Sequence, residues 1–152
     1  MNSIVKQKDS DDMNLSDILS DGLAAPVQEY SPLALAFAGD AVYEVFVRAK
    51  VLAQANASAN TLHKKAICYV KAEAQAAAAK QLIEFLNEDE LAVFKRGRNA
   101  KSATVPKHAN VTDYRYATAL EALFGYLYLS NKTERLNQLL QKTFDFITLL
   151  LT

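Results

Sequence analysis

Three acidic side chains are the only charged residues in two long, mostly apolar stretches of the sequence. Residues 32–47 contain two charged side chains, Asp40 and Glu44, and residues 116–131 contain one, Glu121. A buried ionised carboxylate is unfavourable by several kcal/mol unless a cation or hydrogen-bond donors compensate it. Neither stretch itself contains a cation, so these carboxylates need a partner from another part of the chain or from outside it.

Both stretches are predicted to form helices that pack against each other. Ser31 and Pro32 are a helix-start signature, because Ser caps the first amides and Pro is tolerated in the first turn, and this helix is expected to end near Gln54. Thr112 can cap a second helix over residues 113–129. Since the most apolar helices of a small domain usually pack together, we expect these two to be in contact.

Two glycines indicate that this contact is close. Gly39 and Gly125 lie inside the predicted helices, where Gly costs about 1 kcal/mol relative to Ala. That cost is most easily offset where another backbone must come near. Close packing at these positions would bring Asp40 and Glu121 to one point.

Two converging carboxylates, with no His or Cys beside them, suit a hard cation such as Mg²⁺, which prefers oxygen ligands and keeps several waters. Such an ion can activate water and stabilise the leaving group of a phosphodiester. The alternative is structural: an acid in an apolar helix is often paired with an Arg or Lys from elsewhere in the chain, or lies at the rim with its carboxylate in water. The spacing of Asp40 and Glu121 leaves both interpretations open.

The composition favours a single all-α domain. The chain has 152 residues, 51% of them hydrophobic, with four Gly, three Pro and no Trp. This length can bury its own core, and long runs of Ala, Leu, Lys and Glu without turn residues favour helices. The lone cysteine, Cys68, excludes an internal disulfide. We expect a soluble, cytoplasmic protein, since neither a secretory signal nor an apolar run of about 18 residues for a membrane span is visible.

The remaining segments are predicted from caps and breaks. Residues 1–14 are polar and acidic and are expected to be a disordered lead-in, with one domain over residues 15–152. Residues 98–111 lack periodicity and are expected to form a loop. Further helices are predicted over residues 15–21 before Gly22, from Asn60 or Thr61 to about residue 86, over residues 87–96 with Gly97 as the stop, and over residues 134–151 behind Thr133.

The formal net charge is zero, but acidic and basic residues are concentrated in different segments of the chain. Residues 1–30 carry six acids and two lysines, whereas residues 91–112 contain no acid. Such segregation can place a basic patch on a neutral protein. The basic residues of the acid-free segment are Lys95, Arg96, Arg98, Lys101, Lys107 and His108.

Four motifs in this chain resemble the ribonuclease III family. The segments LALAFAGDAVYEVFVR at 33–48 and ALEALFGYLYL at 119–129 resemble the two signature helices of ribonuclease III catalytic domains, whose Gly-Asp-Ala and Glu-Ala motifs hold metal-binding acids. LHKKA at 62–66 and RGRNAKS at 96–102 resemble the Mini-ribonuclease III branch, which lacks the appended double-stranded-RNA-binding domain. The resemblance covers roughly residues 31–145 and implies a ribonuclease III-like endonuclease domain, an all-α helical bundle.

The resemblance implies an endoribonuclease that hydrolyses double-stranded RNA with Mg²⁺, with Asp40 and Glu121 as metal ligands and catalytic residues. It further implies a homodimer in which each subunit provides one site and cuts one strand. It also implies maturation of the large-subunit (23S) ribosomal RNA precursor, and whether a ribosomal protein assists on the substrate stays open. The rival class is a non-catalytic RNA-binding or scaffold protein on the same fold. Retention of both acids in apolar surroundings favours the enzyme.

Three positions depart from full-length ribonucleases III. Those enzymes have acids one and two turns before the signature aspartate, where this chain has Ala36 and Leu33, and an aspartate three residues before the glutamate, where it has Thr118. The ligand set beyond Asp40 and Glu121 therefore stays open, including a role of Thr118 through its hydroxyl or a bound water.

Glu44 has two interpretations. It lies one turn after Asp40 on roughly the same helix face, where it can assist the site as a neighbour. It can equally well form an ion pair with Arg48 or Lys50, or make a contact behind the residues that form the site.

Residues that could contact RNA fall in two segments. Duplex RNA is bound through phosphates and 2′-hydroxyls across its minor groove, largely by shape, and the basic residues 95–108 resemble the RNA-contacting loop of the family. The alternative is a solvated loop that only keeps the protein soluble. The expected contacts are Arg96, Arg98, Asn99, Lys101 and Ser102, with Lys64 and Lys65 as secondary ones.

Overall fold

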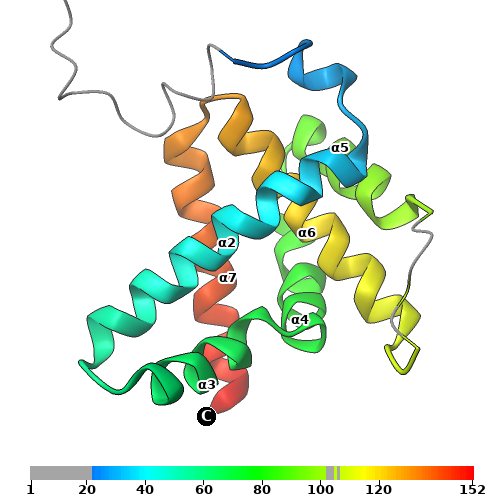
Figure 1. The fold of residues 1–152 in the computed structure, drawn as a ribbon. Helices are drawn as coiled ribbons and strands as arrows, with labels where there is room; N and C mark the ends of the chain where they lie inside the picture. Colours follow the sequence, from blue (N-terminus) through cyan, green and yellow to red (C-terminus); the bar gives the residue numbers. More distant parts are fainter. Residues whose placement is uncertain (1–21, 102–104, 106) are drawn as a thin grey trace, which may run out of the picture.

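The computed structural model describes residues 22–101, 105 and 107–152, which form an all-helical bundle (Figure 1). No strand occurs among these residues, so the all-α prediction is confirmed. The predicted lead-in at 1–14 and the predicted helix at 15–21 lie outside the described residues. The elements, with η for a 3-10 helix, are η2 (Val27–Glu29), α2 (Pro32–Gln54), α3 (Ala59–Val70), α4 (Ala72–Leu82), η3 (Ile83–Phe85), α5 (Glu88–Asn99), α6 (Val111–Leu129) and α7 (Thr133–Leu151).

Helix α6 is the centre of the bundle. Every residue from Ala117 to Leu127 is buried except Glu121, which is partly exposed. Helices α2, α4, α5 and α7 all pack against α6, and Figure 1 shows α2 crossing it. A helix that is apolar on all sides belongs in a core, and this explains why the sequence of α6 shows so little polarity. No helix in the described part of the chain is long and apolar enough to cross a membrane.

Glycines set the distance between α2 and α6. A Cβ atom on Gly39 would overlap the Glu121 carbonyl oxygen and lie 2.7 Å from the Gly125 nitrogen. A Cβ atom on Gly125 would overlap the Leu35 carbonyl oxygen. The prediction that these glycines mark a close backbone approach is confirmed.

The starts of α2 and α6 follow from side-chain caps. Ser31 caps α2 as predicted, since its hydroxyl oxygen accepts a hydrogen bond from the Ala34 amide at 3.1 Å. Helix α6 begins two residues earlier than predicted, because Asn110 rather than Thr112 is the cap. The Asn110 side-chain oxygen accepts from the Asp113 amide at 3.1 Å.

The predicted long helix from residue 60 or 61 to about residue 86 is wrong, because the chain breaks into α3, α4 and η3. Lys71 has extended backbone angles, φ −61° and ψ 146°, although no Gly or Pro lies near it. The buried side chain of Gln75 donates a hydrogen bond to the Val70 carbonyl at this break. The cap of α3 is also different from the predicted Asn60 or Thr61: the Ser58 hydroxyl accepts from the Thr61 amide at 3.2 Å.

Gly97 does not end a helix, contrary to prediction. It is buried inside α5, and a Cβ atom there would lie 2.9 Å from the Ala119 Cα of α6. Gly97 therefore serves close packing in the same way as the glycines of the α2–α6 crossing. Thr133 is not the cap of α7 either, because it is the first residue of that helix and the capping position is Lys132.

Candidate active site

The crossing of α2 and α6 brings Asp40 and Glu121 together. Gly39, directly before Asp40, lies against the backbone carbonyl of Glu121, and the Asp40 charge is close enough to raise the pKa of Glu121. Asp40 is exposed, whereas Glu121 is partly buried. The pair therefore forms a site at the surface with one carboxylate in solvent and one set into the core.

The electrostatics of this pair are unfavourable in the absence of a cation. Burial and the charge of Asp40 raise the pKa of Glu121 to about 7, against an opposing hydrogen bond from Gln75. Burial and the charge of Glu44 raise the pKa of Asp40. Within the described residues neither Asp40 nor Glu121 forms an ion pair with an Arg, Lys or His. Two like charges that lack a cation partner are a feature of functional sites.

The donor atoms at this point fit a hard metal ion that keeps water. No cluster of three or more His, Cys, Asp or Glu side chains is placed to hold a metal in the part of the chain that is described. The carboxylates that could hold one at this point are those of Asp40 and Glu121. Mg²⁺ is commonly bound through one or two carboxylates and retains several waters. The missing third acid agrees with the apolar or hydroxyl side chains at Leu33, Ala36 and Thr118.

Gln75 is a neighbour of the site that the sequence did not reveal. It is 3% exposed, and its Nε2 donates to the Glu121 Oε1 at 3.3 Å and to the Val70 carbonyl at 2.8 Å. Its one signal in the sequence is that it interrupts the alanine-rich run AEAQAAAA. A single Gln in such a run does not distinguish a site from an exposed helix face.

The two possible site neighbours differ in their contacts. Glu44 forms an ion pair with Arg48 at 3.1 Å, as the interpretation of Glu44 as an ion-pair residue predicts. Its charge nevertheless raises the pKa of Asp40. Thr118 is 8% exposed and its hydroxyl donates to the Tyr114 carbonyl at 2.9 Å. The hydroxyl proton of Thr118 is therefore occupied, and only its oxygen can take part in the site as an acceptor.

The comparisons with known proteins agree with this geometry. The ribonuclease III domain family matches residues 33–132, which include both acids. Relatives described as Mini-ribonuclease 3 are 50% identical over 121 residues in Thermoanaerobacter sp. (80% of this chain, 85% of the relative) and 47% identical over 116 residues in Clostridium tetani (76% and 77%). The chain belongs to the Mini-ribonuclease 3 branch of the ribonuclease III family.

A solved structure supports the same assignment for the fold. A crystal structure of a Fusobacterium nucleatum protein superposes with a TM-score of 0.71 at 35% sequence identity, and the match covers 78% of this chain and 95% of that one. As a Mini-ribonuclease 3 family member the chain is an endoribonuclease, a hydrolase that acts on RNA, and enzymes of the ribonuclease III family are metal-dependent. The alternative of a non-catalytic RNA-binding or scaffold protein is thereby disfavoured.

The predicted RNA contacts of this family member are divided between α3 and the end of α5. Lys64 and Lys65 are exposed on α3. Arg96 donates to the Tyr30 carbonyl at 3.4 Å, and Arg98 donates to the Asn99 side chain at 3.4 Å, so both guanidinium groups have partners in the protein. Ser102 lies outside the described residues.

Lys101 lies beside helix α6, which carries Glu121. It lines a pocket of about 320 Å³ together with Arg115 and Thr118, and Thr118 lies one turn before Glu121. Asp40 and Glu121 themselves are not among the residues that line this pocket. Lys101 thus shares a pocket with a residue one turn from Glu121, whereas Lys64 and Lys65 are not among the residues that line it.

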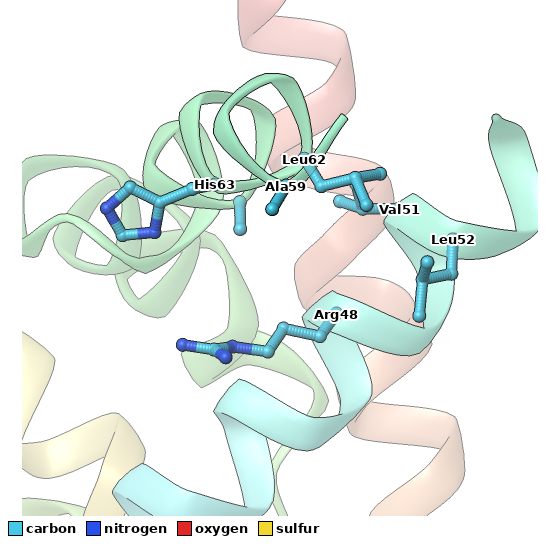
Figure 2. A pocket seen from close by; sticks show the side chains of 7 residues that line it. Arg48, Val51, Leu52, Ala59, Leu62 and His63 are labelled. Atoms are coloured by element: carbon cyan, nitrogen blue, oxygen red, sulfur yellow. The ribbon is translucent and has the colours of Figure 1, made fainter. Parts of the chain in front are cut away.

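A separate pocket lies between α2 and α3. It has a volume of about 230 Å³ and is lined mainly by apolar side chains, among them Val51 and Leu62. Figure 2 shows the Arg48 guanidinium and the His63 ring on the same side of it. None of the predicted site residues lines this pocket, so it is not part of the candidate active site.

Proposed function

We propose that this endoribonuclease cleaves double-stranded RNA with Mg²⁺ held by Asp40 and Glu121. The observation that carries the proposal is the pair of carboxylates at the α2–α6 crossing, each with a raised pKa and neither with a cation partner in the described part of the chain. When bound, Mg²⁺ supplies an activated water and stabilises the leaving 3′ oxygen of a phosphodiester.

The residues of the chain orient this chemistry. The glycine contact fixes the separation of the helices that carry the two acids. Glu121 presents its carboxylate from a partly buried position, and Asp40 presents its carboxylate from the exposed side, where RNA can approach. Exposed cations such as Lys101, which shares a pocket with Thr118 of α6, can bind phosphates of the RNA.

Cleavage of a defined RNA duplex tests this proposal directly. We expect cleavage with Mg²⁺, loss of cleavage with excess chelator, and recovery when Mg²⁺ is restored. A single strand of the same sequence serves as the control substrate and should be cut much more slowly. Cleavage that persists in chelator would exclude the metal-dependent mechanism at Asp40 and Glu121.

We also propose that the protein is a homodimer formed through the outer face of α2. Phe37 is 86% exposed and Val45 is 66% exposed, with exposed Ala41 between them at the helical spacing of four. An exposed apolar stripe of this kind usually marks an interface, and a two-fold dimer is the commonest closed assembly. The stripe begins one turn from Asp40, so each subunit would keep its own site close to the dimer axis.

Light scattering on the Phe37→Glu variant tests the dimer. We expect the wild-type protein to be dimeric at micromolar concentration. We expect the variant to be monomeric, because a charged side chain replaces the exposed aromatic ring of the stripe. Phe85→Glu, which changes a 45% exposed ring on η3 rather than on α2, is the control. A wild-type monomer that cleaves RNA would exclude the dimer.

The biological substrate that we propose is the 23S ribosomal RNA precursor, in the cytoplasm. The support is the relationship to the Mini-ribonuclease III branch. We further propose that residues 15–152 form the catalytic domain and that residues 1–14 are an acidic lead-in to it. Cleavage of precursor transcripts with and without added large-subunit ribosomal proteins would show whether one of these proteins shapes the substrate.

A further inference from the structure

We propose that Gln75 is a positioning residue that holds the Glu121 carboxylate in place for the metal ion. This inference rests on the proposed role of Glu121 as a metal ligand. The Gln75 Nε2 donates to two oxygens, the backbone carbonyl of Val70 at 2.8 Å and the Glu121 Oε1 at 3.3 Å. The amide therefore connects the site to the backbone at the junction of α3 and α4.

The orientation of the Gln75 amide follows from its partners. Both contacts are oxygen acceptors, a backbone carbonyl and a carboxylate, and each needs a donor. The flipped amide would place Oε1 against two oxygens and lose both hydrogen bonds. The NH₂ group must therefore face Glu121, as the structure has it.

This arrangement has a cost that packing alone does not explain. The Gln75 Oε1 is buried and has no hydrogen-bond partner within the described residues, and an unsatisfied buried acceptor is destabilising. The other buried side chains of its helix are all apolar: Ala74, Ala76, Ala78, Ala79 and Leu82. A polar side chain that interrupts such a run and donates to the proposed ligand is typical of the hydrogen bonds that orient metal-binding carboxylates.

Mn²⁺ binding to the RNA-free protein, followed by electron paramagnetic resonance, tests the inference without an activity measurement. Gln75→Met keeps the length and packing of the side chain but removes the donor, and we expect it to weaken Mn²⁺ binding about 10- to 100-fold. With RNA as substrate, kcat should fall while KM for the duplex stays within twofold, because the phosphate contacts are unchanged.

Two control variants separate positioning from folding. Gln81→Met makes the same replacement at an exposed position of α4. Thr143→Val removes a fully buried hydroxyl that donates to the Leu139 carbonyl of α7. Both should bind Mn²⁺ within twofold of the wild type. If Thr143→Val weakens binding as much as Gln75→Met does, the effect comes from stability and the inference is wrong.

Gln75→Asn provides a second variant in case Gln75→Met fails to fold, since it keeps the amide but shortens its reach toward Glu121. Asp40→Asn reports on the proposed metal site itself. If Asp40→Asn abolishes Mn²⁺ binding while Gln75→Met and Gln75→Asn bind normally, the role of Gln75 is refuted and the metal site stands. If Asp40→Asn also binds normally, both the metal site and the role of Gln75 are refuted.

Discussion

The Glu121 carbonyl occupies the place that a side chain on Gly39 would need, so the proposed metal ligand of α6 and the residue before the proposed ligand of α2 are in backbone contact. This contact determines how far apart Asp40 and Glu121 can be. The fold and the site are therefore coupled at one position, and a change there should affect both.

Gly39→Ala is expected to lower the free energy of unfolding by about 3 kcal/mol, the upper part of the usual range for overpacking, because a helix must move rather than a flexible side chain. The same movement should separate the acids and abolish cleavage. Chemical denaturation and a cleavage assay measure the two effects. Gly22→Ala, at an exposed glycine outside the helices, should change neither. Normal cleavage by Gly39→Ala would show that the spacing of the acids is not set by this contact.

Much of this site could be predicted because charge in an apolar helix is conspicuous. Asp40 and Glu121 are visible as charges without local partners, and Gly39 and Gly125 are visible as costly residues within helices. These four residues predict the α2–α6 crossing, which the structure confirms.

Other features could not be predicted because they depend on tertiary contacts. The break at Lys71 has no Gly or Pro to mark it, and the extended backbone there is accompanied by the hydrogen bond from Gln75 to the α3 terminus. Gly97 carries the usual signal of a helix end, yet it packs against Ala119. The sequence shows the same residue type at a helix end and at a helix crossing. Only the residue that packs against the glycine, which the sequence does not show, distinguishes the two.

Duplex RNA binding should depend on the cations at the end of α5. The double variant Arg98→Ala, Lys101→Ala is expected to weaken binding and to lower the slope of log K against log salt by about one for each phosphate that the protein no longer neutralises. Filter binding at several salt concentrations measures this slope. The matched control is Lys142→Ala, on α7, which should leave the slope unchanged. An unchanged slope in the double variant would remove these residues from the interface.

Glu90 and Arg135 should provide acid-sensitive stability. The Glu90 carboxylate is 1% exposed, and Arg135 contacts it at 2.9 Å. Burial acts to raise the pKa of Glu90, but hydrogen bonds from Arg135 and from the Asn87 amide outweigh it and lower this pKa below the ordinary 4.5. The stabilisation is therefore complete above about pH 4.5 and is lost as the pH falls through the lowered value.

Arg135→Ala leaves the buried Glu90 carboxylate without its cation partner and should destabilise the protein by about 3 to 5 kcal/mol at neutral pH. The matched control is Arg48→Ala, which breaks an ion pair with Glu44 that lies mostly in solvent, and it should cost less than about 1 kcal/mol. Thermal melting between pH 3 and pH 7 measures both variants. Equal losses in the two variants would show that burial of the Glu90 pair contributes nothing.

Glu121 should make the metal-free protein less stable as the pH rises. Its pKa is about 7 in the fold, above the ordinary 4.5, so between these values the folded protein keeps a proton that the unfolded chain has released. The free energy of unfolding should therefore fall from about pH 4.5 to about pH 7 relative to Glu121→Gln, which cannot titrate. Melting curves in chelator measure the difference, and added Mg²⁺ should reduce it. Parallel curves for the two proteins would contradict the raised pKa.

Asp40→Asn should separate catalysis from stability. The change keeps size and shape but removes an anion that has no cation partner in the described structure, so turnover should collapse while duplex RNA still binds through its phosphates and 2′-hydroxyls. In chelator the variant should be as stable as the wild type or more stable, because the charge repulsion at Glu121 is relieved and active-site residues commonly trade stability for function. Cleavage with Mg²⁺ and melting with chelator are measured on the same preparation.

If Asp40 had instead paired with a buried cation, the Asp40→Asn variant would lose about 3 to 5 kcal/mol of the free energy of unfolding. Near-normal cleavage combined with such a loss would exclude Asp40 as a catalytic residue.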